Sequence, residues 1–391
     1  MRVLFTFAGN RGHLDPLLPI ARAAVSRGHT VAFAGRPWMM PKVEALGFAC
    51  FSAGIDEGLV PERLPLRPLD RSREIRWGTR KPRARIGDLL PICEAWRPDV
   101  VVWEDTDLAG ALVAERLGLA HASVAVIAAG SFMRPDDVRP AVEELRAELG
   151  LPPDPALDML SRHLVLVPVP PSFRDPAVPL PATTRFIRPA ALEETPDSSP
   201  GWIDALPARP TVYLTLGSVM PLESGDLFAR VIGGIRELPV NLVVTVGDEF
   251  DRAELGPQPD HVRIEPWIPQ ARLLPHCDLV VSHGGSGSVI GALAHGLPLV
   301  VIPLDADQPH NAERCEALGA GLVLDAVAAT AEDVRGAVDA VLSDTAFREA
   351  AMRVHRESIS LPRSAHAVAL LERLVSERRS PTLPPGLASR P

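Results

Sequence analysis

The chain has 391 residues, a length that suggests two domains. Its 46% hydrophobic and 23% charged residues are typical of a globular protein and exclude a disordered or fibrous one. A net charge of -9 lacks the basic footprint of a nucleic-acid-binding protein, and 4 dispersed cysteines without a CxxC pair argue against a disulfide framework or a structural zinc site.

The opening segment, MRVLFTFAGN, lacks the basic region and long apolar core of a signal peptide. No run reaches the ~18 apolar residues that span a bilayer. We therefore expect a cytoplasmic protein with no stable membrane insertion. Its oligomeric state is not readable, and a homodimer is left open.

Residues 3–8, VLFTFA, form a continuous apolar run that predicts a strand buried on both faces. Residues 9–12 turn the chain, and apolar residues at helical spacing follow over 17–25. Gly28 is suited to end this helix, and residues 30–34 predict the next strand. The succession is that of a βαβ unit.

Residues 63–85 depart from the average composition, with nine Arg or Lys and two acidic residues. Prolines interrupt the segment, so we expect a long loop. It is either a solvated loop or a lid that borders an acidic substrate or partner.

The second half of the chain repeats the pattern of the first. Residues 211–215, TVYLT, lead to Gly217 and Ser218 and then to a predicted helix. Alternating strands and helices favour parallel sheets, so we predict an α/β fold of two Rossmann-like, doubly wound domains. Further buried strands are predicted at residues 241–246, 278–282 and 299–303.

Composition also indicates the domain boundaries. Residues 195–210 are rich in Pro, Ser and Asp, which is typical of an interdomain linker. We assign residues 1–195 to the first domain, 196–210 to the linker and 211–360 to the second domain. Residues 379–391 are expected to be a disordered tail.

Residues 282–288, SHGGSGS, follow a predicted strand and precede an apolar helix. The glycines let backbone approach a ligand, and the helix N-terminus offers free N–H groups and a positive dipole end. The loop therefore predicts a phosphate or diphosphate site, although a tight turn needs the same small residues. The candidate donor-binding residues here are His283, Gly284, Gly285, Ser286, Gly287 and Ser288.

Two flanking segments extend this site. Upstream, Trp267 offers a flat ring for a nucleobase, Ile268 offers backbone groups to the base edge, and Gln270 closes the segment. Downstream, Asp307 and Gln308 follow a predicted strand, where open α/β sheets bind ligands, and supply acceptors and donors for sugar hydroxyls. Taken singly, the tryptophan suits a core and the polar pair a solvated turn. Together the segments predict a nucleotide-sugar pocket.

These motifs resemble family 1 glycosyltransferases. EPWIPQ, SHGGSGS, HGLPLVVIP and DQPHNAE are similar to the donor-binding signature of that family, and GNRGHLDPLLPIARAAVSRGH is similar to its glycine–histidine turn and first helix. The most similar group is the actinobacterial enzymes that decorate antibiotics and related polyketides. The resemblance implies a GT-B architecture, with the acceptor held by the N-terminal domain, the donor by the C-terminal domain, and a closing helix at residues 361–378 that crosses back.

The resemblance also implies a mechanism. His13 would be the general base, removing a proton from the acceptor hydroxyl as it displaces the leaving group with inversion at the anomeric carbon. Gly217, Ser218, His283 and the N–H groups of residues 285–288 would stabilise the departing nucleoside diphosphate. No metal or other cofactor is expected. A thymidine diphosphate deoxysugar is favoured as donor, and uridine diphosphate glucose remains open.

The family usually pairs this histidine with an Asp at the end of a middle strand. Here the family spacing falls on Glu104, one methylene longer, with Asp105 and Asp107 as alternatives. The partner would orient the imidazole and stabilise its charged form. Glu104 is the first choice.

For an apolar acceptor, aromatic and Met side chains make adaptable walls. The candidates follow the second strand and the run HASVAVIAAG, although each of them also suits a core. They are Trp38, Met39, Met40, Phe132 and Met133, together with Asn10 in the first turn.

Three other functions compete with this interpretation. Asp305 and Asp307 form a DxD that would hold a divalent cation in a metal-dependent transferase. A non-catalytic helper of a transferase would need no base such as His13. A nicotinamide-dependent oxidoreductase would need a complete Gly-rich fingerprint, which neither half carries.

Overall fold

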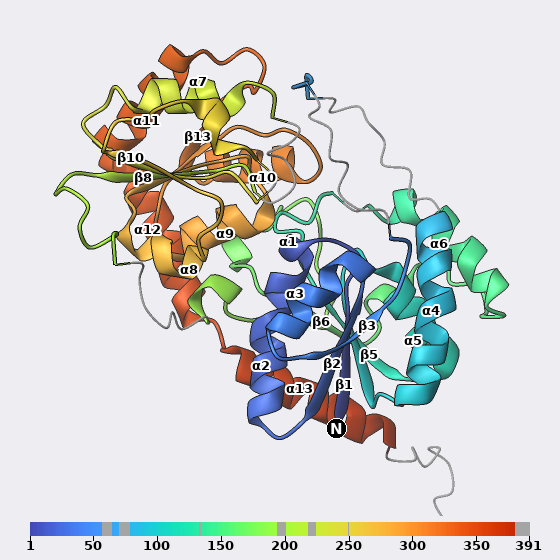
Figure 1. Cartoon of the computed structure of the whole chain (residues 1–391). Helices are drawn as coiled ribbons and strands as arrows, with labels where there is room; N and C mark the ends of the chain where they lie inside the picture. Colours follow the sequence, from blue (N-terminus) through green and yellow to red (C-terminus); the bar gives the residue numbers. More distant parts are fainter. Residues whose placement is uncertain are drawn as a thin grey trace, which may run out of the picture.

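The computed structural model describes residues 1–56, 65–69, 79–132, 134–193, 201–217, 224–248 and 250–379. It shows two domains, each built on a sheet of parallel strands with helices packed against it (Figure 1). The predicted α/β class with two Rossmann-like halves is confirmed.

The N-terminal sheet has seven strands in the order β3-β2-β1-β4-β5-β6-β7. Its central strands are continuous apolar runs because both faces are covered, and Val3, Leu4 and Phe5 are fully buried. The strand order reverses between β1 and β4, and the carboxyl ends at such a reversal are where doubly wound sheets bind ligands. The strands are β1 (Arg2–Thr6), β2 (Thr30–Gly35), β3 (Ala49–Ser52), β4 (Val100–Glu104), β5 (Ala120–Val124), β6 (Leu164–Val167) and β7 (Thr184–Phe186), and the α-helices are α1 (Arg11–Leu14), α2 (Leu18–Ser26), α3 (Met40–Ala45), α4 (Arg80–Trp96), α5 (Leu108–Leu117) and α6 (Pro135–Glu148).

The C-terminal sheet has six strands in the order β10-β9-β8-β11-β12-β13, and its order reverses between β8 and β11. The glycine-rich loop that follows β11 therefore lies at the equivalent ligand-binding position. The strands are β8 (Thr211–Thr215), β9 (Asn241–Thr245), β10 (Val262–Glu265), β11 (Leu279–Ser282), β12 (Leu299–Val301) and β13 (Gly321–Val323), and the α-helices are α7 (Leu227–Ile235), α8 (Gln270–Leu273), α9 (Ser286–Ala294), α10 (Gln308–Ala317), α11 (Ala331–Ser343), α12 (Thr345–Ser360) and α13 (Ser364–Arg379).

The described part of the predicted linker is attached to the C-terminal domain. Residues 201–205 form turns, Ile203 is buried in the C-terminal core, and the Arg263 guanidinium lies 4.2 Å from the centroid of the Trp202 ring. Residues 194–200 lie outside the described residues.

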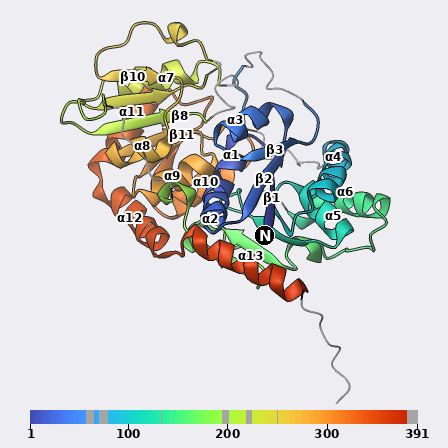
Figure 2. The ribbon, with the colours of Figure 1, turned by 60° about the horizontal axis from the view of Figure 1, so that its bottom comes forward.

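Helix α13 leaves the C-terminal domain and lies along the N-terminal domain beside α2 (Figure 2). Ala367, Val368 and Leu371 bury one face of α13 in the core of that domain. On the rim, the Arg27 guanidinium pairs with the Glu372 carboxylate at 2.6 Å. Helix α13 therefore packs onto the N-terminal domain and ties the end of the C-terminal domain to it.

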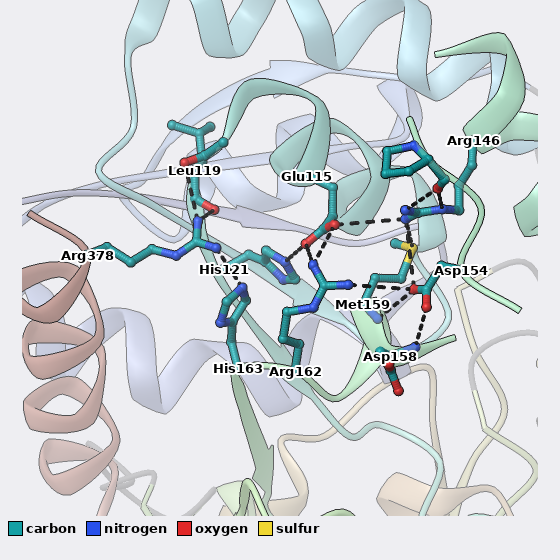
Figure 3. Close-up of polar contacts among 12 residues, drawn as sticks. Glu115, Leu119, His121, Arg146, Asp154, Asp158, Met159, Arg162, His163 and Arg378 are labelled. Carbon is teal, nitrogen blue, oxygen red and sulfur yellow. Dashed lines mark hydrogen bonds and ion pairs between the residues drawn. The ribbon is translucent and has the colours of Figure 1, made fainter. Parts of the chain in front are cut away.

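A polar network holds the far end of α13 (Figure 3). Arg378 donates to the Leu119 carbonyl at 2.6 Å and to Nε2 of His163 at 2.8 Å. Glu115 accepts from Nε2 of His121 at 3.1 Å and pairs with Arg162 at 3.0 Å. Burial and the neighbouring cations lower the pKa of His163 to about 4, so its ring is neutral and free to accept this bond.

Glu115, His121 and His163 bring ligand atoms within 4.8 Å of one another, which is the geometry of a candidate metal cluster. Their atoms are already hydrogen-bonded, and the Arg146 and Arg162 guanidiniums next to Glu115 would repel a cation. His121 also lies near the amino end of β5, away from the carboxyl-end site. We interpret the cluster as structural.

No helix among the described residues combines the length and apolarity required to cross a membrane.

The packing of α13 generates a first prediction. Replacing the fully buried Leu371 with Ala should destabilise the N-terminal domain by about 2–5 kcal/mol, because it removes apolar contacts and leaves a cavity. Urea unfolding followed by circular dichroism measures the change. The exposed Arg373→Ala on the same helix is the control. Equal midpoints for the two variants would show that α13 contributes no core packing.

Candidate active site

The turn after β1 presents His13 at the carboxyl end of the N-terminal sheet. Asn10 caps α1, its Oδ1 accepting from the Gly12 N–H at 2.8 Å, which places His13 in the single turn of that helix. A methyl group at Gly9 would lie only 2.0 Å from the imidazole ring. Only glycine at position 9 therefore permits this ring position.

Glu104, the last residue of β4, meets His13 across the switch point of the sheet. Its carboxylate is fully buried, and Oε1 lies 3.2 Å from His13 Nδ1. Three further donors hold it: the N–H of Ala8 at 3.0 Å, and the N–H and hydroxyl of Thr106, both at 2.8 Å. The His13 side chain remains 27% exposed. A fixed carboxylate therefore orients an imidazole that stays accessible.

The two groups shift each other's titration. Burial alone would lower the pKa of His13, but the Glu104 charge and hydrogen bond outweigh it and raise that pKa above 6.5. Burial would raise the pKa of Glu104, but His13 and the backbone donors lower it below 4.5. The pair is thus a carboxylate beside an imidazole with increased basicity.

The other two acids proposed as partners of His13 have different roles. Asp105 Oδ1 accepts from the Val126 N–H at 3.0 Å, and burial together with Glu104 raises its pKa to about 7. Asp107 is buried in a bidentate pair with Arg85, at 3.0 and 2.6 Å. Of the three acids, Glu104 is therefore the one in contact with the His13 ring.

In the C-terminal domain, the loop after β11 turns at Gly284, which has a φ of +86°, and leads into the N-terminus of α9. His283 is buried in this turn, and an added Cβ at Gly217 or Gly285 would lie 2.7 or 2.5 Å from its Nε2. Burial lowers the pKa of His283 to about 4 against the opposing effects of Asp307 and of a hydrogen bond with the Thr215 backbone. A neutral imidazole at this turn suits an anion-binding site.

Trp267 is not a core residue. Its side chain is 48% exposed, and the Arg11 guanidinium of the other domain lies 4.8 Å from its ring centroid. Ile268 is buried beside it, and Gln270 begins α8 with its amide 3.4 Å from the Ser288 hydroxyl. The Trp267 ring, predicted as a platform for the base, is therefore accessible, and the Arg11 guanidinium stacks on it.

Asp307 and Gln308, predicted to bind sugar hydroxyls, have different partners within the protein. Asp307 is partly exposed, with Oδ2 held by the Ser286 hydroxyl at 2.5 Å. Gln308 is buried, and its side-chain oxygen accepts from the N–H groups of Leu304 and Asp305 at 2.8 and 3.1 Å. The side-chain oxygen of Gln308 is therefore used within the loop, whereas the Asp307 carboxylate is partly accessible.

The acceptor candidates are only partly brought together. Met39 and Met40 are buried in the N-terminal core and contribute packing, which corrects their expected place in an acceptor wall. Trp38 and Phe132 are half-buried, and Asn10 caps α1. Ser218 of the donor set and Met133 lie outside the described residues.

The Arg-rich segment is also corrected in part. Residues 57–64 and 70–78 lie outside the described residues, but α4 begins at Arg80, so the end of the expected loop is helical. Arg83 pairs with Glu144 and Glu148 of α6, and Arg85 pairs with Asp107. These two cations hold the N-terminal domain together and are not available to an acidic ligand.

Four polar residues or segments of the site could not be predicted from the sequence. They are Thr106, Arg11, Asn311 and the N–H groups of residues 128–129, which contact Glu104, Trp267 and the glycine-rich loop. A single polar residue has no periodicity or spacing that would reveal it. Only Asn311 has a local cue, because it stands four residues after Asp307 and shares its helix face.

Taken together, the carboxyl-end loops of two Rossmann-like domains contact each other, with a carboxylate–imidazole pair on one side and a glycine-rich turn on the other. These features match the GT-B glycosyltransferase that the sequence motifs imply.

Comparisons with known proteins agree. The family model described as "Erythromycin biosynthesis protein CIII-like, C-terminal domain" matches residues 229–374. L-demethylnoviosyl transferase of Streptomyces niveus is 32% identical, over 98% of this chain and 100% of that protein. 10-deoxymethynolide desosaminyltransferase of Streptomyces venezuelae is 29% identical, over 97% and 99%. The solved spinosyn rhamnosyltransferase SpnG complexed with thymidine diphosphate superposes with a TM-score of 0.80 at 25% identity, over 95% and 100%.

The chain therefore belongs to the family of antibiotic glycosyltransferases. It is an enzyme of this class, and the resemblance inferred from its motifs is confirmed.

The pair of His13 and Glu104 generates a prediction about titration. In the wild type, the pKa of His13 should lie above 6.5, and in Glu104→Gln it should fall, because the Glu104 charge is lost while burial remains and only the weaker effects of Asp105 and Asp307 oppose it. NMR titration of ring-labelled histidines measures both values, with His13→Ala to assign the resonance. Asp105→Asn should cause a smaller decrease, since Asp105 acts on the ring through its charge alone. An unchanged value in Glu104→Gln would contradict the pairing.

Proposed function

We propose that the protein transfers a deoxysugar from a thymidine diphosphate donor to a hydroxyl group of an apolar natural-product acceptor, with inversion and without a metal ion. The observation that carries this proposal is the buried Glu104 carboxylate 3.2 Å from Nδ1 of a partly exposed His13. The relatives support the substrate classes: their names specify desosaminyl and demethylnoviosyl transfer, and a solved neighbour holds thymidine diphosphate.

The geometry suggests how His13 acts. In the neutral imidazole, Nδ1–H donates to Glu104, which leaves the lone pair of Nε2 to accept a proton. As the acceptor oxygen attacks the anomeric carbon, its proton passes to Nε2 and the bond from that carbon to the diphosphate oxygen breaks. The electron pair of the broken bond stays with the diphosphate. Glu104 then stabilises the imidazolium formed.

The C-terminal domain would bind the donor. The N–H groups at the start of α9 and the neutral His283 would receive the diphosphate, and Trp267 would stack on the base. Asp307 would accept hydrogen bonds from the sugar. Stabilisation of the leaving group by these fixed donors is the role that a metal ion takes in other transferases.

The assignment of the base predicts a separation of binding from turnover. His13→Ala should lower kcat by about 10²–10⁴-fold, because general-base catalysis is lost, while affinity for thymidine diphosphate stays within about two-fold. Calorimetric titration and a coupled assay for released nucleotide measure the two quantities. Weaker nucleotide binding with the rate retained would contradict the assignment.

Metal independence has its own test. Because fixed N–H groups and His283 are proposed to hold the diphosphate, activity in excess EDTA should equal activity in untreated enzyme. Loss of activity that magnesium or manganese restores would favour the alternative in which Asp305 and Asp307 hold a cation.

A further inference from the structure

Asn311 lies at the junction of the two domains. It is fully buried on α10, one turn after Asp307. Its Oδ1 accepts from the N–H of Ala129, which follows β5 in the N-terminal domain, at 3.1 Å. Its Nδ2 donates toward the Gly284 carbonyl at 2.9 Å, the Ser286 hydroxyl at 3.1 Å and the Asp307 carboxylate at 2.8 Å. One amide thus contacts both domains and three residues of the donor site.

The surrounding contacts determine which way this amide points. Its oxygen faces a backbone N–H and its nitrogen faces three acceptors, so the reverse orientation would lose every bond. Ser286 continues the chain of hydrogen bonds: its hydroxyl accepts from the Ala128 N–H at 2.7 Å and donates to Asp307 Oδ2 at 2.5 Å. Asp307 is therefore held on one oxygen by two donors, each of which is itself held by the N-terminal domain.

The segment that supplies these N–H groups is firmly fixed on its own domain. Arg174 donates to the carbonyls of Ile127 and Ala128 at 2.9 and 3.1 Å, and the Asp175 N–H donates to the Ala129 carbonyl at 3.0 Å. Phe132, an acceptor candidate, lies three residues further along this segment. The acceptor side of the enzyme is thereby connected through short hydrogen bonds to the carboxylate on the donor side.

We propose that Asn311 is a positioning residue that couples the segment after β5 to Asp307, so that contact between the two domains orients the carboxylate toward the donor sugar. This inference rests on the proposed role of Asp307 in binding the sugar. Asn311 itself touches neither substrate. It acts by directing Oδ2 of Asp307 into the protein, which leaves the other oxygen for a sugar hydroxyl.

The test is Asn311→Asp, which keeps the size of the side chain and an oxygen for Ala129 but removes the N–H donors. Wild type and variant are titrated by calorimetry at pH 7.5 with thymidine diphosphate, thymidine diphosphate glucose and thymidine diphosphate rhamnose. We expect the affinity for thymidine diphosphate to fall less than the affinity for the two sugar nucleotides, because Asn311 also donates to the Gly284 carbonyl of the proposed diphosphate loop. The additional affinity contributed by the sugar should fall by about ten-fold, because a charge-assisted hydrogen bond is lost and a second carboxylate is introduced beside Asp307.

Lowering the pH distinguishes a positioning role of Asn311 from a general distortion of the donor site. Two carboxylates this close share a proton, and the shared proton restores a donor toward Asp307. The sugar-dependent affinity of Asn311→Asp should therefore recover at pH 5.5, which a merely distorted site would not show. If Asn311→Asp does not fold, Asn311→Ser, which also removes the amide donor to Asp307, should show the same sugar-specific loss.

Arg314→Ala is the matched control. Arg314 lies on the same helix and donates across the same domain boundary to the carbonyls of Phe173 and Ser172, at 3.0 and 2.9 Å, without touching the glycine-rich loop. Its removal should leave both affinities unchanged within about two-fold. Equal losses in Arg314→Ala and Asn311→Asp, or no sugar-specific loss in the latter, would overturn the role of Asn311. A wild type that binds no sugar nucleotide more tightly than thymidine diphosphate would instead overturn the proposed role of Asp307.

Discussion

The structure depends on a carboxylate buried at the centre of a parallel sheet. Removing the Glu104 charge from water is costly, and it is offset by donors that converge from three neighbouring segments: Ala8, His13 and Thr106. Those segments are brought together because β1 and β4 are adjacent at the reversal of strand order. The fold thus brings a histidine that follows the first strand against the acid that ends the fourth. The requirement for glycine at position 9 follows from the same arrangement.

Two histidines face the junction of the domains, and their environments move their titration in opposite directions. His13 has a buried anion beside it, which makes it a stronger base. His283 is buried with no carboxylate of the described residues in direct contact, so burial lowers its pKa to about 4 and the ring is neutral at pH 7. A neutral imidazole can donate a hydrogen bond to a bound anion although it carries no charge itself. Opposite shifts in neighbouring titratable groups are a recognised sign of separate catalytic duties.

Much of this was predictable from the sequence, and the exceptions have physical causes. Buried strands and glycine turns are local patterns, so the two sheets, the turn before His13 and the glycine-rich turn after β11 could be predicted. Glu104 was reached by the spacing that the family resemblance supplied. Met39 was expected in the acceptor wall and lies in the core, because local sequence does not distinguish a side chain at the edge of a site from one packed beneath it. Arg85 was assigned to a loop because its partner, Asp107, lies on another element. Asn311 acts across the domain boundary, and contacts of that kind have no signature along the chain.

The central claim is that a sugar held by the C-terminal domain presents its anomeric carbon to His13 while Glu104 holds the far side of the ring. A crystal structure of the enzyme with an intact thymidine diphosphate sugar tests it most directly. The account predicts that the diphosphate lies at the start of α9 beside His283, with the anomeric carbon facing Nε2 of His13. A diphosphate bound at the turn after β1, or an anomeric carbon directed away from His13, would contradict it.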